Sequence, residues 1–256
     1  MKRLILGALL CALSPFALAQ NAATGLPAQG VTQLFSCHLA AGQNMEDVWS
    51  LLEAVRDQIT EPRSGFSLFL WTPFRGATGY DYVWGATDAS LTAMMEGMAE
   101  YARSPGARLL GPRFAAVNER CDSVVLLSEQ MKAGAIGNTA DRMPDAMVET
   151  FACRLKPGAT QADVRNAAEF WQQQVPKIAS ADLDTYEAYM VIPFRGGSGE
   201  ADFGWIGNYP DMTTFGRGET AYMNAKEGQA ANERFEKVST CRTALWNGYW
   251  VMTPAP

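Results

Sequence analysis

A phrase of four residues occurs twice in this chain and constrains its fold more than any other feature. Pro73-Phe74-Arg75-Gly76 returns as Pro193-Phe194-Arg195-Gly196, at an offset of 193 − 73 = 120 residues. An apolar run precedes each copy, glycines lie inside it and an aromatic run follows, which is the pattern of a β-hairpin. The sequence therefore predicts two equivalent hairpins.

The repeat extends well beyond this phrase. Phe35 and Phe151 match at an offset of 151 − 35 = 116 residues, and Trp84 and Trp205 at an offset of 205 − 84 = 121. An offset that is nearly constant, and that drifts only where loops are expected, indicates an internal duplication. Further pairs at similar offsets are Cys37 and Cys153, Tyr101 and Tyr222, and Cys121 and Cys241.

Each copy predicts the element order β-α-β-β-α-β. Asn44 and Thr160 each precede an aspartate three residues later, a variant of the capping box that begins a helix. Gly216 and Gly218 each weaken a helix by about 1 kcal/mol relative to alanine, so we expect a broken segment before a helix at 229–238. The expected strands are 31–39, 66–72, 80–86 and 121–127 in the first copy, and 148–155, 185–192, 202–207 and 241–252 in the second.

This element order is the split βαβ or ferredoxin-like arrangement. We therefore predict an α+β protein with two tandem ferredoxin-like βαββαβ repeats, at 30–127 and 146–254, joined by a linker at 128–145. The tandem copies resemble the dimeric α/β-barrel superfamily, in which two such units pack sheet against sheet. The resemblance implies an intramolecular pseudo-dimer, and it leaves open whether the protein is a monomer or a homo-oligomer.

Four of the five cysteines lie within the two copies. In a ferredoxin-like unit the first and last strands are antiparallel neighbours, so a cysteine late in the first strand can face one early in the last. This arrangement predicts one disulfide between Cys37 and Cys121 and another between Cys153 and Cys241. Four buried free thiols are the alternative.

The first nineteen residues have the layout of a cleaved secretory signal. Lys2 and Arg3 precede an apolar stretch at 4–13, and Ala17-Leu18-Ala19 precedes Gln20. We predict that residues 1–19 are removed and that the mature protein is periplasmic or secreted. No later stretch is long and apolar enough for a stable membrane anchor, and the net charge of -6 argues against a nucleic-acid partner.

The sequence offers few constellations of catalytic residues. His38 is the only histidine, and it adjoins a cysteine in an expected strand. This position argues against a catalytic triad, a haem site and a His/Cys metal site. We therefore predict no catalytic residue, no metal and no cofactor, and the sequence leaves open whether the protein is an enzyme.

The repeated hairpins hold the residues that the sequence marks for binding. Arg75 and Arg195 are expected at hairpin mouths, and the aromatic residues after them share a strand face by period two. In one interpretation these residues line a cavity between sheet and helices and bind a small, anionic organic ligand. In the other, each arginine pairs with the next aspartate, Asp81 or Asp202, and the aromatic side chains fill the core. The aromatic residues are Tyr82, Trp84, Phe203 and Trp205.

Three classes of function agree with these features. The first is an exported small-molecule-binding or structural protein. The second, implied by the superfamily resemblance, is a cofactor-independent monooxygenase-like enzyme acting on a small aromatic or quinone-type compound. The superfamily also contains haem proteins of the chlorite dismutase kind. The third class is a protein-interaction module that uses exposed sheet or hairpin surface.

Overall fold

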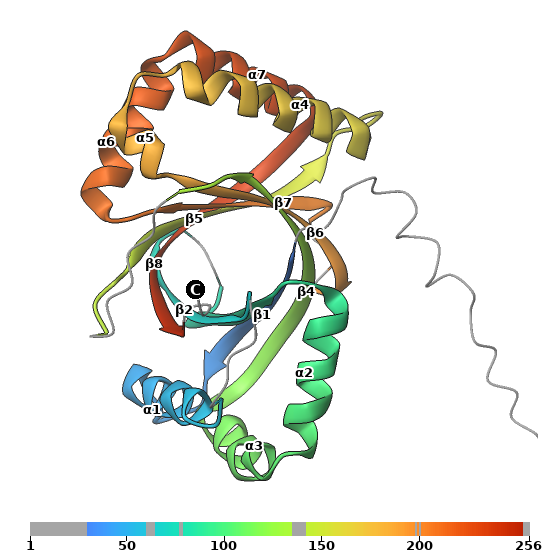
Figure 1. Cartoon of the computed structure of the whole chain (residues 1–256), viewed down its shortest axis with the longest axis vertical. Coiled ribbons are helices and arrows are strands. Elements are labelled where there is room, and N and C mark those ends of the chain that lie inside the picture. Colours follow the sequence, from blue (N-terminus) through green and yellow to red (C-terminus); the bar gives the residue numbers. More distant parts are fainter. Residues whose placement is uncertain are drawn as a thin grey trace, which may run out of the picture.

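Antiparallel strands close into a single barrel that has helices on two opposite sides (Figure 1). The computed structural model describes residues 30–59, 65–76, 79–134, 142–197, 199 and 201–252. The predicted signal segment at 1–19 and residues 135–141 of the predicted linker lie outside the described residues. Below, the N-terminal half means residues 30–134 and the C-terminal half means residues 142–252.

Each half contributes four strands to the barrel. The N-terminal half contains β1 (Gly30–Leu39), β2 (Ser67–Arg75), β3 (Tyr82–Asp88) and β4 (Asn118–Lys132). The C-terminal half contains β5 (Ala146–Leu155), β6 (Glu187–Gly196), β7 (Phe203–Tyr209) and β8 (Ser239–Met252). Around the barrel the order is β1-β3-β2-β8-β5-β7-β6-β4. Because β4 runs to Lys132, it takes up the first residues of the segment predicted as a linker.

The helices of each half cover one side of the barrel (Figure 1). Those of the N-terminal half are α1 (Met45–Arg56), α2 (Leu91–Arg103) and α3 (Pro105–Val117). Those of the C-terminal half are α4 (Gln161–Gln174), α5 (Ala181–Thr185), α6 (Met212–Asn224) and α7 (Lys226–Val238), with a short 3-10 helix, η2 (Val175–Lys177), after α4. The capping boxes predicted at Asn44 and Thr160 are confirmed.

The prediction of two tandem ferredoxin-like repeats packed sheet against sheet is wrong. β2 hydrogen bonds to β8 and β4 hydrogen bonds to β6, so the strands of the two halves join edge to edge in one closed barrel. The physical reason lies in the strand edges. Two separate sheets would leave unpaired backbone N–H and C=O groups along β2, β4, β6 and β8, and closure of the barrel pairs them.

The repeated Pro-Phe-Arg-Gly phrase lies at the two seams where the halves join. At the β2–β8 seam the register shifts between Pro73 and Arg75, and at the β4–β6 seam it shifts opposite Pro193 and Arg195. A proline has no N–H to donate, which suits an irregular position in a sheet. Gly196 has a positive φ of 74°, and its Cα lies too close to the facing backbone of β4 to carry a side chain. The phrase therefore serves barrel closure.

Each half carries the cysteine pair that the sequence predicts. Cys37 on β1 is bonded to Cys121 on β4, directly opposite in the register. Cys153 on β5 is bonded to Cys241 on β8 in the same way. Each disulfide therefore links the first and last strands of its half.

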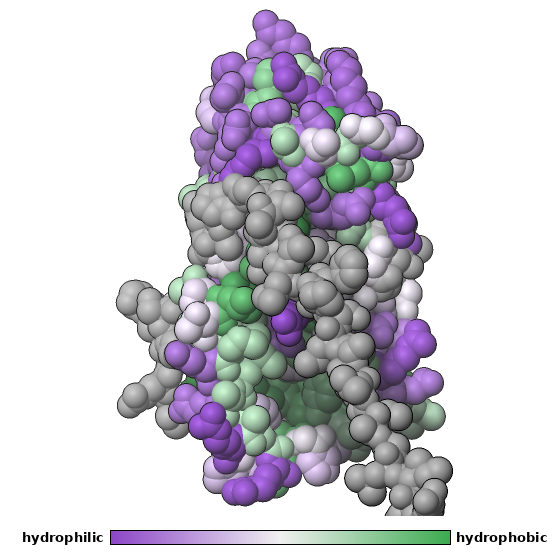
Figure 2. Space-filling view, turned by 90° about the vertical axis from the view of Figure 1, so that its right-hand side faces the viewer, coloured by the Kyte–Doolittle hydropathy of each residue, from purple (hydrophilic) through white to green (hydrophobic). Residues whose placement is uncertain are grey.

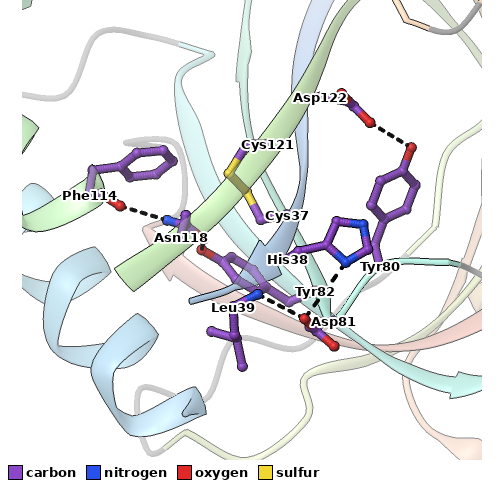
Figure 3. Close-up of a disulfide and its surroundings, with 10 residues drawn as sticks. All are labelled: Cys37, His38, Leu39, Tyr80, Asp81, Tyr82, Phe114, Asn118, Cys121 and Asp122. Carbon is purple, nitrogen blue, oxygen red and sulfur yellow. Dashed lines mark hydrogen bonds and ion pairs between the residues drawn. A yellow bond between two sulfur atoms is a disulfide. The ribbon is translucent and has the colours of Figure 1, made fainter. Parts of the chain in front are cut away.

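The aspartates that follow the repeated phrase hold strand ends together. Figure 3 shows Asp81 beside the first disulfide, where its Oδ2 accepts a hydrogen bond of 2.8 Å from the backbone N–H of Leu39. Asp202 accepts an equivalent bond of 2.7 Å from the N–H of Leu155. Both aspartates thus bind the backbone of the adjacent strand.

Helix α6 is continuous through Gly216 and Gly218, where the sequence predicts a broken segment. Gly218 is buried against the barrel, and a Cβ added there would lie 2.6 Å from Cε1 of Tyr209 on β7. Close packing of α6 on β7 therefore offsets the low helix propensity of glycine. This approach also brings Glu219, the next residue of α6, close to the strand.

The apolar core has three parts. One lies inside the barrel, includes Phe69, Trp71, Val148 and Trp246, and borders a cavity of about 240 Å³. The other two lie between the outer face of the barrel and the helices, one in each half. Within the described ranges, none of the helices combines the length and apolar character that crossing a membrane requires.

Helix α2 leaves much of its apolar surface uncovered. Met94 is its buried residue, whereas Met95, Met98 and Tyr101 are 42%, 44% and 39% exposed. Figure 2 shows this side of the molecule, where apolar residues gather in the lower half and the upper half is mostly hydrophilic.

Candidate ligand-binding site

A cavity of about 600 Å³ lies in the C-terminal half, between the outer face of the barrel and helices α4, α6 and α7. We call it the C-terminal cavity. Its volume lies in the range of small-molecule binding sites. Eight aromatic side chains line it: Phe151, Trp171, Tyr186, Phe203, Trp205, Tyr209, Tyr222 and Phe235.

Strand periodicity explains how the barrel supplies this wall. Along β5, Glu149, Phe151 and Cys153 line the cavity, while the intervening Val148 packs inside the barrel. Along β7, Phe203 and Trp205 line the cavity, again at alternate positions. Because successive strand residues face opposite sides, one strand serves both the barrel core and the cavity.

Glu149 is the most unusual residue of the wall, because it is a carboxylic acid that is only 7% exposed. Its Oε1 accepts a hydrogen bond of 2.8 Å from the hydroxyl of Tyr186. That hydroxyl in turn accepts a bond of 3.0 Å from Nε1 of Trp205. Gly207 makes room for this arrangement, since a Cβ there would lie 2.7 Å from the same Oε1 atom.

Burial and a like charge change the acidity of this carboxyl group. Desolvation, followed by the negative charge of Glu219, raises the pKa of Glu149 to about 8. The hydrogen bond from Tyr186 acts in the opposite direction, because it stabilises the carboxylate. Burial and the nearby charge therefore favour the protonated form of Glu149.

Glu219 brings a second carboxyl group to the cavity from α6. Its Oε1 accepts a hydrogen bond of 2.9 Å from the hydroxyl of Tyr209 on β7. Burial raises its pKa above the ordinary value. The ring of Tyr209 lies 4.5 Å from the ring of Tyr186, centroid to centroid, so the two carboxyl–tyrosine pairs are neighbours.

The outer part of the cavity is lined from α6, α7 and β8. The hydroxyl of Tyr222 donates to Oδ1 of Asn232 at 2.9 Å. Lys156 donates to the backbone carbonyl of Glu236. Met223, which is 56% exposed, lines the cavity where it reaches the surface.

Only some of the residues that the sequence marks for binding line the C-terminal cavity. Phe203 and Trp205 line the C-terminal cavity. Arg75 and Arg195 are exposed at the ends of β2 and β6, and neither is among the residues that line it. The guanidinium of Arg195 lies 5.6 Å from the ring centroid of the adjacent Phe194.

Tyr82 and Trp84 belong to the N-terminal half. The hydroxyl of Tyr82 donates a buried hydrogen bond of 2.6 Å to Oδ1 of Asn118, whose amide donates to the Phe114 carbonyl at 3.0 Å (Figure 3). Trp84 stacks on Phe35 with 4.3 Å between ring centroids. These two residues therefore pack in the apolar core of the N-terminal half.

Sequence reasoning missed Glu149, Tyr186, Tyr209 and Glu219. One signal for Glu149 was available, because period two places it on the same strand face as Met147 and Phe151, which is a core face. An acid on such a face is a sign of a site. Glu219 gave no comparable signal, since its helix contains the two glycines that indicate a break.

The residues of the cavity do not fit a haem that needs a histidine ligand. His38, the only histidine of the chain, lies on β1 in the N-terminal half, where its Nε2 is 3.1 Å from Arg120 Nη2. It is not among the residues that line the C-terminal cavity.

No protein-family model and no curated protein sequence matches this chain, but solved structures share its architecture. A "putative monooxygenase" from Fusobacterium nucleatum subsp. nucleatum has a TM-score of 0.63 at 10% identity, over 90% of this chain and 98% of that chain. Another from Lactobacillus acidophilus has a TM-score of 0.60 at 9% identity, over 89% and 98%. The fold is that of the dimeric α/β-barrel superfamily.

The superfamily resemblance predicted from the sequence is thus confirmed at the level of fold. A "putative chlorite dismutase" aligns more loosely, with a TM-score of 0.50 at 12% identity over 87% of this chain and 96% of that chain. The dimeric α/β-barrel fold supports several chemistries, so function has to be argued from the site itself.

Proposed function

We propose that the C-terminal cavity binds a small organic molecule with a large aromatic or apolar surface. One observation carries this proposal: the carboxyl group of Glu149 is buried in a wall otherwise made largely of aromatic rings. Burying an ionisable group costs several kcal/mol unless a partner compensates, so its position favours a binding role over a purely structural one. The rings supply contact area, and Glu149 supplies an oriented polar contact.

Thermal-shift assays and calorimetry on the purified protein test this proposal. The compounds are indoles, phenols, quinones, aromatic amines and aromatic acids. Met223→Trp should narrow the opening of the cavity. Met212→Trp is the matched control, because Met212 is also exposed on α6 but does not line the cavity.

We expect at least one compound to raise the melting temperature and to bind about tenfold more weakly to the Met223→Trp protein than to the Met212→Trp protein, a difference of about 1.4 kcal/mol. The proposal fails if no compound binds, or if both variants bind every compound equally.

An enzymatic function is the second candidate, and the pKa of Glu149 favours it. A carboxylate whose conjugate acid has a pKa of about 8 is a stronger base than an ordinary carboxylate, so the ionised fraction of Glu149 can accept a proton from a substrate. On a phenol or hydroquinone, Glu149 would take the hydroxyl proton and leave an electron-rich phenolate that can react with dioxygen. The names of two structural neighbours support an oxygenase-like reaction of this kind.

Oxygen uptake measured with an electrode separates the enzyme from a binding protein. Each compound that binds is supplied to the wild type and to the Glu149→Gln protein. We expect uptake that depends on the compound and is lost in the variant. If every bound compound leaves oxygen uptake at the background rate, the enzymatic candidate is excluded.

We also propose that the protein acts outside the cytoplasm, in the periplasm or the medium. The two disulfides favour an oxidising compartment, and residues 1–19 have the layout of a signal peptide. Mass spectrometry of the protein from cell fractions should find an N-terminus at Gln20 and no free thiols. A chain that keeps Met1 and stays reduced in the cytoplasm would contradict this.

A further inference from the structure

The phenol and indole donors beside the two buried carboxyl groups of the C-terminal cavity form hydrogen bonds within the wall. Tyr186 donates its hydroxyl proton to Glu149, and Tyr209 donates its own to Glu219. The indole N–H of Trp205 donates to the Tyr186 oxygen. Lone pairs of carboxyl and phenol oxygens remain for a ligand. Such a wall favours a molecule that donates hydrogen bonds.

Carboxyl groups outnumber cationic groups in the wall of the C-terminal cavity. Glu149, Glu219 and Glu236 line the cavity, and Lys156 is the one cationic side chain among the described residues that line it. The ammonium group of Lys156 binds the backbone carbonyl of Glu236 at the outer end. The two deeper carboxyl groups therefore have tyrosine partners and no cation.

Aromatic rings surround these carboxyl groups. Trp171 and Trp205 meet edge to face, with 4.8 Å between centroids, and Tyr186 and Tyr209 lie 4.5 Å apart. The face of an aromatic ring carries partial negative charge and attracts cations, most strongly in a desolvated site. Carboxylates and ring faces thus favour the same kind of ligand.

We infer that the ligand of this cavity is an organic cation, a protonated amine on an aromatic or apolar body, with its ammonium group beside Glu149 and Glu219. This inference rests on the proposed binding function and specifies its ligand class. The anionic ligand expected from the sequence depends on Arg75 and Arg195, and neither lines the cavity. The wall selects the opposite charge.

Such binding is linked to the release of a proton. The ionisable groups that face Glu149 are Tyr186, Tyr209, Glu219 and Tyr222. None of them is a cation. The pKa of Glu149 in the free protein is therefore about 8, and the carboxyl group is mainly protonated at pH 7. An ammonium ion stabilises the carboxylate and lowers this pKa. Binding near pH 7 should therefore release up to about one proton for each amine bound.

Three probes of similar shape test the inference: 2-phenylethylamine as the cation, 2-phenylethanol as the neutral analogue and 3-phenylpropionate as the anion. Titration calorimetry at pH 7 in two buffers with different ionisation enthalpies gives both the affinity and the number of protons released. We expect the amine to bind at least about tenfold more tightly than the alcohol, with proton release. The acid should bind most weakly.

Variants that remove one carboxyl group test which residues bind the ammonium group of the amine. Glu149→Gln should weaken the amine by about tenfold or more and leave the alcohol nearly unchanged. Glu219→Gln should act in the same direction, and it keeps the test available if the first variant does not fold. Glu169→Gln is the matched control, because Glu169 is exposed on α4 and does not line the cavity.

The outcomes separate this inference from the proposed function. If the alcohol or the acid binds as tightly as the amine, the cation inference is overturned while the binding function stands. If none of the three probes binds but another neutral or acidic aromatic compound does, the cation inference is again overturned and the binding function stands. If no aromatic compound binds, both proposals fail.

Discussion

Trp84 and Trp205 hold matching places in the two halves. In the register, Trp84 faces Phe35 on β1 and Trp205 faces Phe151 on β5. Each indole also packs edge to face on a phenylalanine of the last helix in its half, at 5.6 Å from Phe114 and 5.8 Å from Phe235. The two indole N–H groups differ in their hydrogen bonding. Nε1 of Trp205 donates to Tyr186, whereas Nε1 of Trp84 is buried without a partner among the described residues.

The strand register explains the difference. Gly207 pairs with Glu149 on β5 and with Ala188 on β6, two residues after Tyr186. In the N-terminal half, Ala86 pairs with Gln33 on β1 and with Leu68 on β2, two residues after Phe66. The residues that correspond to Tyr186, Glu149 and Gly207 are therefore Phe66, Gln33 and Ala86.

The N-terminal half has its buried hydroxyl elsewhere. Tyr82 faces Cys37 in the register, and its hydroxyl binds Asn118 at the end of α3. Phe203, which faces Cys153, holds the corresponding place and has no hydroxyl. The same strand arrangement therefore holds a buried polar group at the end of the sheet in the N-terminal half and at its centre in the C-terminal half. Only the central position meets the second carboxyl group from the helix above it.

The disulfides should contribute equally to both halves, and this is the largest effect we predict. They close loops with sequence separations of 84 and 88 residues. The chain-entropy model gives each about 4 to 5 kcal/mol of stabilisation. Urea denaturation of the Cys37→Ser/Cys121→Ser and Cys153→Ser/Cys241→Ser proteins should show similar losses. A loss confined to one pair would break the equivalence of the halves.

The second largest effect should be a pH dependence of stability that comes from Glu149 in the C-terminal half. The pKa of Glu149 is about 8 in the folded protein and near 4.5 in the unfolded chain, so between these values the folded state binds the extra proton. Stability should therefore fall as pH rises from about 4.5 to 8, by up to about 1.4 kcal/mol per pH unit from this group. Denaturation curves across this range should show the slope reduced in the Glu149→Gln protein and kept in the Glu169→Gln protein. Parallel slopes in all three would contradict the prediction.

Removing one hydroxyl should make the C-terminal half resemble the other. Tyr186→Phe leaves Trp205 Nε1 without its acceptor and Glu149 without its donor. A buried group that loses its partner costs about 1 to 3 kcal/mol, so the unfolding free energy should decrease by that amount. The pKa of Glu149 should rise further, which titration by NMR can follow. An unchanged unfolding free energy would show that the hydrogen-bond chain contributes little.

The converse change should have the smallest effect and the opposite sign. Phe66→Tyr places a hydroxyl where the register indicates that Trp84 Nε1 lacks an acceptor. A satisfied buried hydrogen bond is worth about 1 kcal/mol, so the N-terminal half should become more stable by that amount. Phe114→Tyr is a control on the helix side, because it adds a hydroxyl to a ring at another face of the indole. Equal effects of both changes would argue against the correspondence with Tyr186.

The features of the fold that could be predicted from the sequence depend on residues that are close in the chain or lie within one half. The capping boxes at Asn44 and Thr160 involve neighbours in sequence, and the cysteine pairs depend only on the strand order within a half. Closure of the barrel depends on contacts between halves, which period and propensity do not encode. The same holds for α6, where packing against Tyr209 overrides the propensity of Gly218.

The candidate site was predictable only in its apolar part. Strand period two placed Phe203 and Trp205 on one face, and both line the cavity. Glu149 and Glu219 meet there although 219 − 149 = 70 residues separate them, and no spacing motif announces such a pair. The repeated phrase drew attention to Arg75 and Arg195 because it is conspicuous, but its proline and glycine act on the backbone at the seams.

The closed barrel limits how copies of this protein can associate. Each of the eight strands has a hydrogen-bonded neighbour on both sides, so among the described residues no strand is available for a second chain to extend the sheet. Self-association would have to use helices or loops. Helix α2, whose Met95 and Met98 are exposed, lies on the side of the molecule that faces the viewer in Figure 2, and contact through this helix would leave the barrel intact.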